Sequence, residues 1–256
     1  MVNKFKANKD LGQHFLKNES DVKKICNTIE DSSPNLIEIG PGPGVLTKEL
    51  ISKNLPLIVV EKDSRFIEHL KAMSESIQVY NEDALKFNLA DLNLKNVWLV
   101  SNLPYNISVA LMMNFIEYDF IDGMTLMFQK EVGDKFLITP KSNLLSMIMN
   151  PFYKTSRLMN LKPGAFNPPP EVDSTVIVFK KNVSPLINPS ELLNYKVFVK
   201  HLYSFKRKQI KGNLKYKKSH DIALIFKKYD ISLTARAQEL NLDQVVALYK
   251  EFENGN

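Results

Sequence analysis

Four consecutive residues, Asn102-Leu103-Pro104-Tyr105, combine two hydrogen-bond acceptors, a rigid turn and an aromatic ring. Such a set suits methylation of an adenine amine, a poor nucleophile because its lone pair is delocalised into the ring. Acceptors on both N–H groups, here the Asn102 side-chain oxygen and the Leu103 carbonyl, would expose that lone pair. Pro104 biases Leu103 toward an extended conformation, and Tyr105 offers a face for a flipped-out base. Alone, the four residues could equally be a turn that ends a strand.

A glycine-rich turn and two acids precede this tetrapeptide. The turn, residues 40–44 with Gly40 and Gly42, permits close backbone approach to a ligand. Its spacing differs from the dinucleotide fingerprint, and no Gly-Lys-Ser/Thr follows. Glu61, about 20 residues on, can accept both ribose hydroxyls of a nucleoside, and Asp83 can accept a hydrogen bond from an adenine amino group. Each alone could be a structural turn or a strand-end acid, but the series predicts a site for S-adenosylmethionine.

All four features follow predicted strands. Short, largely apolar segments predict strands at residues 36–39, 57–60, 77–80, 97–100 and 124–128. The run at residues 57–60 is apolar throughout, which is typical of strands buried on both faces. Helical patterns lie between them, at residues 45–53, 66–73 and 107–116, and an earlier helix covers residues 20–31 with Ser20 as its N-cap. This alternation predicts an α/β, Rossmann-like sheet of the class I methyltransferase type, with ligands beyond the carboxyl ends of the strands.

The pattern changes after about Met147. A late apolar run at residues 176–179 follows a proline cluster at residues 168–170, and residues 182–189 have the composition of a linker. From Ser190 onward the patterns are helical and basic. We therefore expect a methyltransferase domain at residues 1–182 and a small C-terminal α-helical domain at residues 183–256.

Positive charge is concentrated near the C-terminus. The chain has a net charge of +6, but residues 180–228 hold 13 Lys or Arg against two acids, so their balance is +11 and that of the rest is −5. This asymmetry favours a polyanionic partner, although solvated helix faces of lysine-biased composition would look similar. Basic and aromatic residues alternate here, which favours RNA backbone contact through Lys206, Arg207, Lys208 and Lys211.

Several protein classes are disfavoured. No apolar run of about 18 residues indicates a membrane span, and the lysine-rich N-terminus resembles neither a secretory signal nor a transit peptide. Cys26 is the only cysteine, which excludes an internal disulfide framework and favours a reducing cytoplasm. No His, Cys or Asp pair has metal-ligand spacing, so we expect no metal.

Six blocks in order resemble the rRNA adenine dimethyltransferase family, most closely its bacterial small-subunit branch: residues 11–16, 38–44, 102–105, 128–132, 163–174 and 203–214. The resemblance implies donor contacts from His14, Leu16, Gly40, Glu61, Asp83 and Asn102. It also implies that Phe166 stacks on the target base opposite Tyr105. Two residues depart from the family pattern: His14 stands where many relatives have asparagine, and Lys206 replaces an arginine, which loses bidentate phosphate geometry.

The resemblance implies an activity. The chain would transfer methyl groups from S-adenosylmethionine to two adjacent adenines near the 3′ end of small-subunit (16S) rRNA, two per base, during ribosome biogenesis. A pre-assembled small-subunit precursor would be the substrate, and the protein would act as a monomer. Motif chemistry leaves open methylation of large-subunit rRNA, as in macrolide resistance, or of DNA. A ribosome-assembly or transcription factor without required catalysis is a further alternative, which the intact Asn102, Glu61 and Asp83 disfavour.

Overall fold

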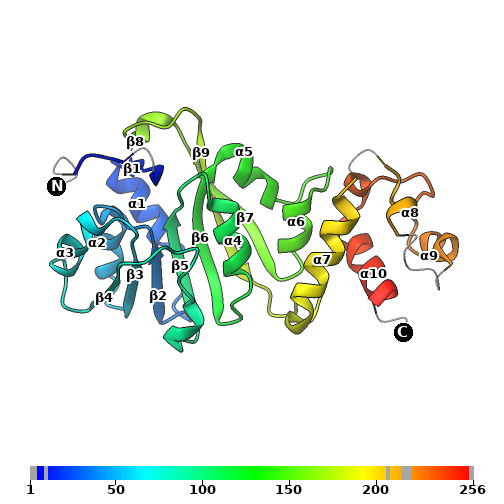
Figure 1. Ribbon diagram of the computed structural model, residues 1–256, viewed down its shortest axis with the longest axis horizontal. Coiled ribbons are helices and arrows are strands. Elements are labelled where there is room, and N and C mark those ends of the chain that lie inside the picture. Colours follow the sequence, from blue (N-terminus) through cyan, green and yellow to red (C-terminus); the bar gives the residue numbers. More distant parts are fainter. Residues whose placement is uncertain (1–4, 9–10, 206–207, 215–220, 254–256) are drawn as a thin grey trace. The chain divides into compact units, whose positions relative to one another are not determined.

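A computed structural model of the chain describes residues 5–8, 11–205, 208–214 and 221–253. Its central element is a seven-stranded sheet with the order β4-β3-β2-β5-β6-β9-β7. The strands β4, β3, β2, β5 and β6 follow this order from left to right in Figure 1 and are parallel, whereas β9 is antiparallel to β6. The strands are β2 (Asn35–Ile39), β3 (Leu57–Val60), β4 (Ile77–Tyr80), β5 (Val97–Asn102), β6 (Ile121–Gln129), β7 (Tyr153–Leu161) and β9 (Ser174–Lys181).

Helices follow the predicted alternation with the strands. The side chains of α1, α2 and α3 pack into one core with Leu57 and Val59, so these helices cover one face of the sheet. Ile58 and Val60 point to the opposite face because successive strand residues alternate, and α4 lies in front of the sheet in Figure 1. The helices are α1 (Glu19–Cys26), α2 (Val45–Ile51), α3 (Ile67–Lys71), α4 (Ser108–Phe115) and α5 (Lys130–Gly133), with 3₁₀ turns at η3 (Ser64–Phe66), η4 (Leu89–Leu92) and η5 (Asp134–Phe136).

The predicted start of the first helix was wrong by two residues. Asn18 is the N-cap, and its side-chain oxygen accepts a hydrogen bond from the backbone N–H of Ser20 at 2.9 Å. Ser20 therefore lies within the first turn. Both residues are good caps, and the apolar periodicity that begins at Val22 does not distinguish between them. The placement of Cys26 on the buried face is confirmed, because its side chain is fully buried.

The order of the strands reverses between β2 and β5. Strands β3 and β4 extend the sheet on one side of β2, whereas β5 and β6 extend it on the other. The in-register pairs Ile39↔Val60 and Val60↔Tyr80 bring the carboxyl ends of β2, β3 and β4 level with one another. Loops that leave adjacent strands at such a reversal diverge and leave a crevice above the sheet. The order of the strands therefore determines where the crevice lies, above the carboxyl ends of β2 and β5.

The segment before α1 is held by a distant part of the chain. β1 (Phe15–Leu16) pairs with β8 (Phe166–Asn167) in a separate two-stranded antiparallel sheet, where Leu16 is opposite Phe166. A 3₁₀ turn, η6 (Pro163–Ala165), precedes β8, and the backbone N–H of Lys17 donates to the carbonyl of Ala165 at 3.0 Å. This pairing keeps residues 11–16 close to the carboxyl ends of the strands.

The chain divides into two compact units. The first comprises residues 1–134 and 156–180, and the second comprises residues 135–155 and 181–256. The second unit is helical, and rings of Tyr195 and Phe198 pack edge-on against Tyr249 in its core, with the Tyr195 hydroxyl donating to the Met147 carbonyl at 2.9 Å. Its elements are α6 (Leu144–Met149), η7 (Pro189–Glu191), α7 (Leu192–Tyr203), α8 (Ile210–Asn213), α9 (Ile222–Lys228), η8 (Ala237–Glu239) and α10 (Leu242–Glu253).

The helical unit thus contains more of the chain than residues 183–256. Residues 135–155, which include α6, join it because Tyr195 and other α7 side chains bury against that helix. This grouping depends on contacts between segments about 45 residues apart. The sequence pattern changes after about Met147, but the domain boundary was placed at residues 182–189, where the composition is that of a linker.

Candidate active site

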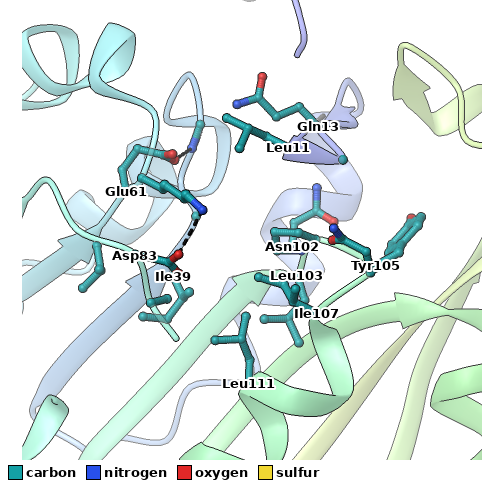
Figure 2. Close-up of a pocket in the computed structure, with 18 of the residues that line it drawn as sticks. Leu11, Gln13, Ile39, Glu61, Asp83, Asn102, Leu103, Tyr105, Ile107 and Leu111 are labelled. Atoms are coloured by element: carbon teal, nitrogen blue, oxygen red, sulfur yellow. Dashed lines mark hydrogen bonds and ion pairs between the residues drawn. The ribbon is translucent and has the colours of Figure 1, made fainter. Parts of the chain in front are cut away.

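A pocket opens at the carboxyl ends of β2, β3, β4 and β5. Its walls come from four loops of the first unit and from the segment that precedes α1. Figure 2 shows Glu61 and Asp83 on one side of this pocket and Asn102, Leu103 and Tyr105 on the other. Leu11 and Gln13 lie above these groups, and apolar side chains, including Ile39, Ile107 and Leu111, lie deeper.

The glycine-rich turn after β2 leaves space beside its backbone. Gly40 and Gly42 have φ angles of +65° and +56°, in the left-handed region that glycine tolerates best. A Cβ atom on Gly40 would meet no atom within 4 Å, whereas one on Gly42 would lie 3.0 Å from the Phe15 ring. Gly40 therefore faces open space in the pocket, and Gly42 allows Phe15 to pack closely. Both line the pocket.

Glu61 is the acid at the end of β3, and only 5% of it is exposed. One carboxylate oxygen accepts from the Gly42 N–H at 2.8 Å, and the other accepts from the Asp63 N–H at 2.7 Å. Burial raises the pKa of Glu61, although these backbone donors oppose that effect. The two bonds fix the orientation of the carboxylate, and each oxygen keeps a lone pair that can accept a hydroxyl proton from a ligand.

Asp83 follows β4 and lies on the same side of the pocket as Glu61. Its carboxylate accepts from the Leu85 N–H at 3.0 Å and forms an ion pair with Lys62 at 2.9 Å. Lys62 holds the pKa of Asp83 below its usual range, so the group is an ionised acceptor. Sequence analysis singled out Asp83 but not Lys62, because a lysine in a loop gives no signal of what it pairs with.

The tetrapeptide after β5 presents its two predicted acceptors. The Asn102 side-chain amide donates to the backbone carbonyl of His14 at 2.7 Å, which leaves its oxygen as the free end of the amide. Among the described residues, neither this oxygen nor the Leu103 carbonyl accepts a hydrogen bond. Asn102, Leu103 and Pro104 all line the pocket. Both oxygens thus have no protein donor in the described part of the chain, and their pairing on a target amine stays a prediction.

Tyr105 is anchored at both its ring and its hydroxyl. Its ring stacks on His14, with centroids 5.7 Å apart and planes inclined by 22°, and its hydroxyl lies 2.5 Å from the Ser174 hydroxyl. Burial raises the pKa of Tyr105. The His14 ring in turn lies 2.9 Å from the Pro168 carbonyl. One face of Tyr105 is thus already covered by a residue that the sequence assigned to the donor.

Two residues that the family resemblance placed in the site lie outside this pocket. Phe166 is 1% exposed and belongs to the core cluster between β1 and the sheet, so its stacking on a base would require β8 to separate from β1. Leu16 is also buried, and it lines a small neighbouring cavity with Glu38 and Asn102. Sequence reasoning could not detect this burial, because the β1–β8 pairing joins segments about 150 residues apart.

Glu38 is a buried acid that the glycine motif contains but sequence analysis gave no role. Its carboxylate accepts from the Thr47 hydroxyl at 2.6 Å, and burial raises its pKa to about 8. Asp63 and Gln13 were also missed, and they are hydrogen-bonded to each other at 2.8 Å. Glu38 and Gln13 lie in motifs that were used for other positions, whereas Asp63 lies outside the six blocks, two residues after Glu61.

The predicted RNA-contacting residues are in the second unit. Lys208 is exposed and lies over the Phe205 ring, with its ammonium 4.9 Å from the centroid, and Lys211 is exposed on α8. Lys206 and Arg207 lie outside the described residues. The two described lysines thus have the solvent access that phosphate contact requires.

Two kinds of feature are absent from the described residues. None of their helices has the length and apolar character needed to cross a membrane. Within the same part of the chain, no group of three or more His, Cys, Asp or Glu side chains is arranged to hold a metal ion.

Comparisons with known proteins identify the family of the chain. A family model described as "Ribosomal RNA adenine dimethylase" matches residues 4–254. Proteins named ribosomal RNA small subunit methyltransferase A from Malacoplasma penetrans and Bdellovibrio bacteriovorus are 34% and 36% identical to the chain. The first alignment covers 98% of this chain and 93% of the relative, and the second covers 96% and 92%.

Solved structures show the same architecture. A dimethyladenosine transferase from Plasmodium falciparum superposes with a TM-score of 0.78 and 25% identity, covering 94% of this chain and 98% of that one. The 23S rRNA methyltransferase ErmE gives a TM-score of 0.77 over 93% and 99% of the two chains, but at 21% identity it supports the fold alone.

Proposed function

Because the chain belongs to the ribosomal RNA adenine dimethylase family, we propose how its own residues perform the family's reaction. It is an S-adenosylmethionine-dependent rRNA adenine dimethyltransferase. We propose that it transfers methyl groups to the exocyclic amines of two adjacent adenines near the 3′ end of small-subunit rRNA, giving dimethyladenosines. The names of its relatives refer to the small ribosomal subunit, and a similar solved structure is a dimethyladenosine transferase. The assignment of individual residues to this reaction is our proposal.

The pocket fits the donor in three places. The open space beside Gly40 admits a ligand close to the backbone, the oriented Glu61 carboxylate can accept ribose hydroxyls, and the ionised Asp83 can accept from the adenine amine. Ile39 and Val60 supply an apolar wall for an aromatic base. S-adenosylmethionine supplies an electrophilic methyl group when it is bound. His14 and Gly42, which line the pocket, complete the donor contacts that we propose, whereas Leu16 lines the neighbouring cavity.

One observation carries the catalytic proposal: the Asn102 amide is fixed by its own N–H group. Its donation to the His14 carbonyl at 2.7 Å leaves its oxygen, beside the Leu103 carbonyl, to accept the two N–H groups of a target adenine. Both acceptors are held by the protein before the substrate binds, so little reorganisation is needed in the transition state. The adenine nitrogen lone pair is then directed away from the ring system, toward the methyl group.

Tyr105 and Phe166 are the aromatic groups that we assign to the target base. Tyr105 lines the pocket and is half-buried, and its Ser174 hydrogen bond fixes the tilt of its ring. Stacking on such a ring can hold a base that has left its helix. Phe166 could contribute only after a rearrangement at β8. Tyr105 is therefore the residue that positions the base in the present conformation.

The substrate and the roles of the two units are also proposals. The relatives' names refer to the small ribosomal subunit, and we propose that a precursor of this subunit, in the cytoplasm, binds a monomer of the protein. Residues 1–182 would carry out the methyl transfer. Residues 183–256 would contact rRNA phosphates through Lys206, Arg207, Lys208 and Lys211, because exposed cations neutralise a polyanion with little geometric demand.

A methylation assay tests this function. Purified small subunits that lack the modification, large subunits and duplex DNA would each be incubated with the protein and radiolabelled S-adenosylmethionine. We expect label in the small subunit alone, at two adjacent adenines near the 3′ end of its rRNA. Robust labelling of large-subunit RNA alone would contradict the proposed substrate and would favour the macrolide-resistance reaction.

A further inference from the structure

A buried carboxylate beside the donor pocket accepts hydrogen bonds from Arg65 and from Gln13 of the N-terminal segment. Asp63 is 7% exposed, and its Oδ2 accepts from the Gln13 side-chain amide at 2.8 Å and from an Arg65 guanidinium nitrogen at 2.5 Å. Its Oδ1 accepts from the Arg65 Nε at 2.8 Å. These donors, Arg65 foremost, lower the pKa of Asp63 to about 2, so it is an ionised acceptor across the physiological range.

Gln13 is held at both ends of its side chain. Its amide nitrogen donates to Asp63, and its Oε1 accepts from the Asn8 backbone N–H at 2.8 Å. A second guanidinium nitrogen of Arg65 donates to the Lys6 carbonyl at 3.1 Å. The pair Asp63–Arg65 therefore fixes the N-terminal segment at two points. Figure 2 shows Gln13 above the pocket, between Glu61 and Asn102.

The residue after Gln13 holds the catalytic amide. The His14 carbonyl accepts from the Asn102 side-chain N–H at 2.7 Å. Gly12, the residue before Gln13, has a φ angle of +63°. It lies against Pro104, since a Cβ atom on Gly12 would lie 3.9 Å from the Pro104 Cβ. The position of the His14 carbonyl is thus set by a backbone that is fixed by Gln13 and packed on the catalytic turn.

The direction of the Asn102 amide depends on that carbonyl. A carboxamide has a donor end and an acceptor end, and a carbonyl oxygen can accept only from the donor end. If the His14 carbonyl moved away, the amide could rotate by half a turn and present its NH₂ group to the amine, where two donors would face each other. The orientation of the Asn102 amide is therefore set by His14, a residue outside the tetrapeptide 102–105.

The same loop also contacts the donor acid. The Asp63 backbone N–H donates to the Glu61 carboxylate at 2.7 Å, so Glu61 and Gln13 are hydrogen-bonded to one residue. We propose that Asp63 and Gln13 are positioning residues that orient Asn102, through the His14 carbonyl, and thereby couple the donor acid to the group that accepts the target amine. This inference rests on the proposed function, because it assigns a role in the same reaction.

The proposal is tested by exchanging the hydrogen-bond donor of Gln13 with the acceptor of Asp63. Gln13→Ala removes the Gln13–Asp63 hydrogen bond. Asp63→Asn weakens it, because the one carbonyl oxygen of asparagine cannot accept both from Gln13 on one side and from the Arg65 Nε on the other. Combining Asp63→Asn with Gln13→Glu restores one donor and one acceptor with the roles reversed, at unchanged net charge. Gln78→Ala is the matched control, since Gln78 is exposed on β4 and lies outside the pocket lining.

The rate constant kcat is measured at saturating donor and saturating small subunits. We expect each single variant to lower kcat about tenfold, because small displacements of a catalytic group are costly. The double variant should recover to within about twofold of wild type, since it re-forms the hydrogen bond, and Gln78→Ala should match wild type. An unchanged kcat with weakened donor binding would overturn the proposal, as would a loss in the double variant that equals that of the single variants.

Nuclear magnetic resonance gives a second readout that does not depend on turnover. The Asn102 side-chain amide signals are assigned by their disappearance in Asn102→Asp. They should shift in Gln13→Ala and return toward their wild-type positions in the double variant. Signals that stay in place in Gln13→Ala would overturn the inference. If wild-type protein fails to methylate small subunits, the proposed function fails, and these signals still decide whether Gln13 orients Asn102.

Discussion

The pocket of the first unit and the basic surface of the second use polar residues in opposite ways. In the pocket, Glu61, Asp83 and Asn102 are each held by at least one hydrogen bond of 3.0 Å or less from a fixed group. On the basic surface, Lys208 and Lys211 are exposed. Directing an amine requires defined geometry, whereas attracting phosphates requires only charge of the right sign and density. The contrast separates residues that act by position from residues that act by charge.

The comparison predicts that disturbing a positioned group in the pocket is costly even when the group's size is kept. Glu61→Gln keeps the shape of the side chain, but its NH₂ end would face one of the backbone N–H donors of Gly42 and Asp63. Charge-assisted hydrogen bonds contribute about 1.5–3 kcal/mol each, so donor affinity should fall about 10–100-fold. Calorimetric titration with S-adenosylhomocysteine measures this change. An unaltered dissociation constant would mean that Glu61 holds the turn but not the donor.

On the basic surface, the corresponding change should act through charge alone. Lys208→Ala combined with Lys211→Ala should weaken binding to small-subunit rRNA severalfold at moderate salt. It should also reduce the slope of log K against log salt by about 0.7–0.9 for each phosphate that these lysines neutralise. The charge-matched control is Lys24→Ala with Lys71→Ala, two exposed lysines of α1 and α3. If the control variant reduces the slope equally, the whole positively charged protein attracts the RNA, and Lys208 and Lys211 do not form a specific RNA-binding surface.

A smaller effect is expected at the anchored aromatic ring. Tyr105→Phe retains the ring but removes the hydroxyl that lies 2.5 Å from Ser174. We expect kcat to fall about threefold, a loss of about 0.6 kcal/mol, because one neutral hydrogen bond contributes about 0.5–1.5 kcal/mol. Ser174→Ala should have the same effect, and the two changes should not be additive. Additive losses measured in the double variant would show that the two hydroxyls act separately.

The last expected effect concerns stability and pH rather than turnover. Glu38 has a pKa near 8 in the folded protein against 4.5 for an ordinary glutamate, so folding takes up a proton between these values. The stability that it lends is complete below pH 4.5 and is lost as the pH rises through 8. Glu38→Gln, which can still accept from Thr47, should therefore reduce the fall in Tm between pH 5 and pH 9. A pH profile of Tm identical to wild type would place the protonation elsewhere.

The sequence predicted the first unit better than the second, for physical reasons. The parallel strands are short and largely apolar, and β2, β3, β4 and β5 lie where the sequence predicted strands. β7 was missed because its sequence, YKTSRLMNL, is largely polar and has several exposed positions. The parallel sheet then placed Glu61, Asp83 and Asn102 together, because their spacing from strand ends is local.

Other parts of the site depend on contacts that no local pattern encodes. The two-residue strands β1 and β8 pair across about 150 residues, and this pairing buries Phe166. Lys62 and Asp63 follow Glu61 directly, yet their partners, Asp83 and Gln13, are 21 and 50 residues away. Residues 135–155 join the helical unit through packing of α6 on α7. Sequence spacing predicts which residues reach the pocket, but not which partners orient them.

The most direct test of a positioned acceptor pair is the kcat of Asn102→Ala, measured beside its affinity for S-adenosylhomocysteine. Removal of one preorganised acceptor should lower kcat at saturating donor and small subunits by about 10²–10³-fold, while donor affinity changes by less than about tenfold. Turnover equal to that of wild type would contradict the role of the Asn102 oxygen, and an equal loss in kcat and in donor affinity would show that Asn102 serves the donor and not the amine.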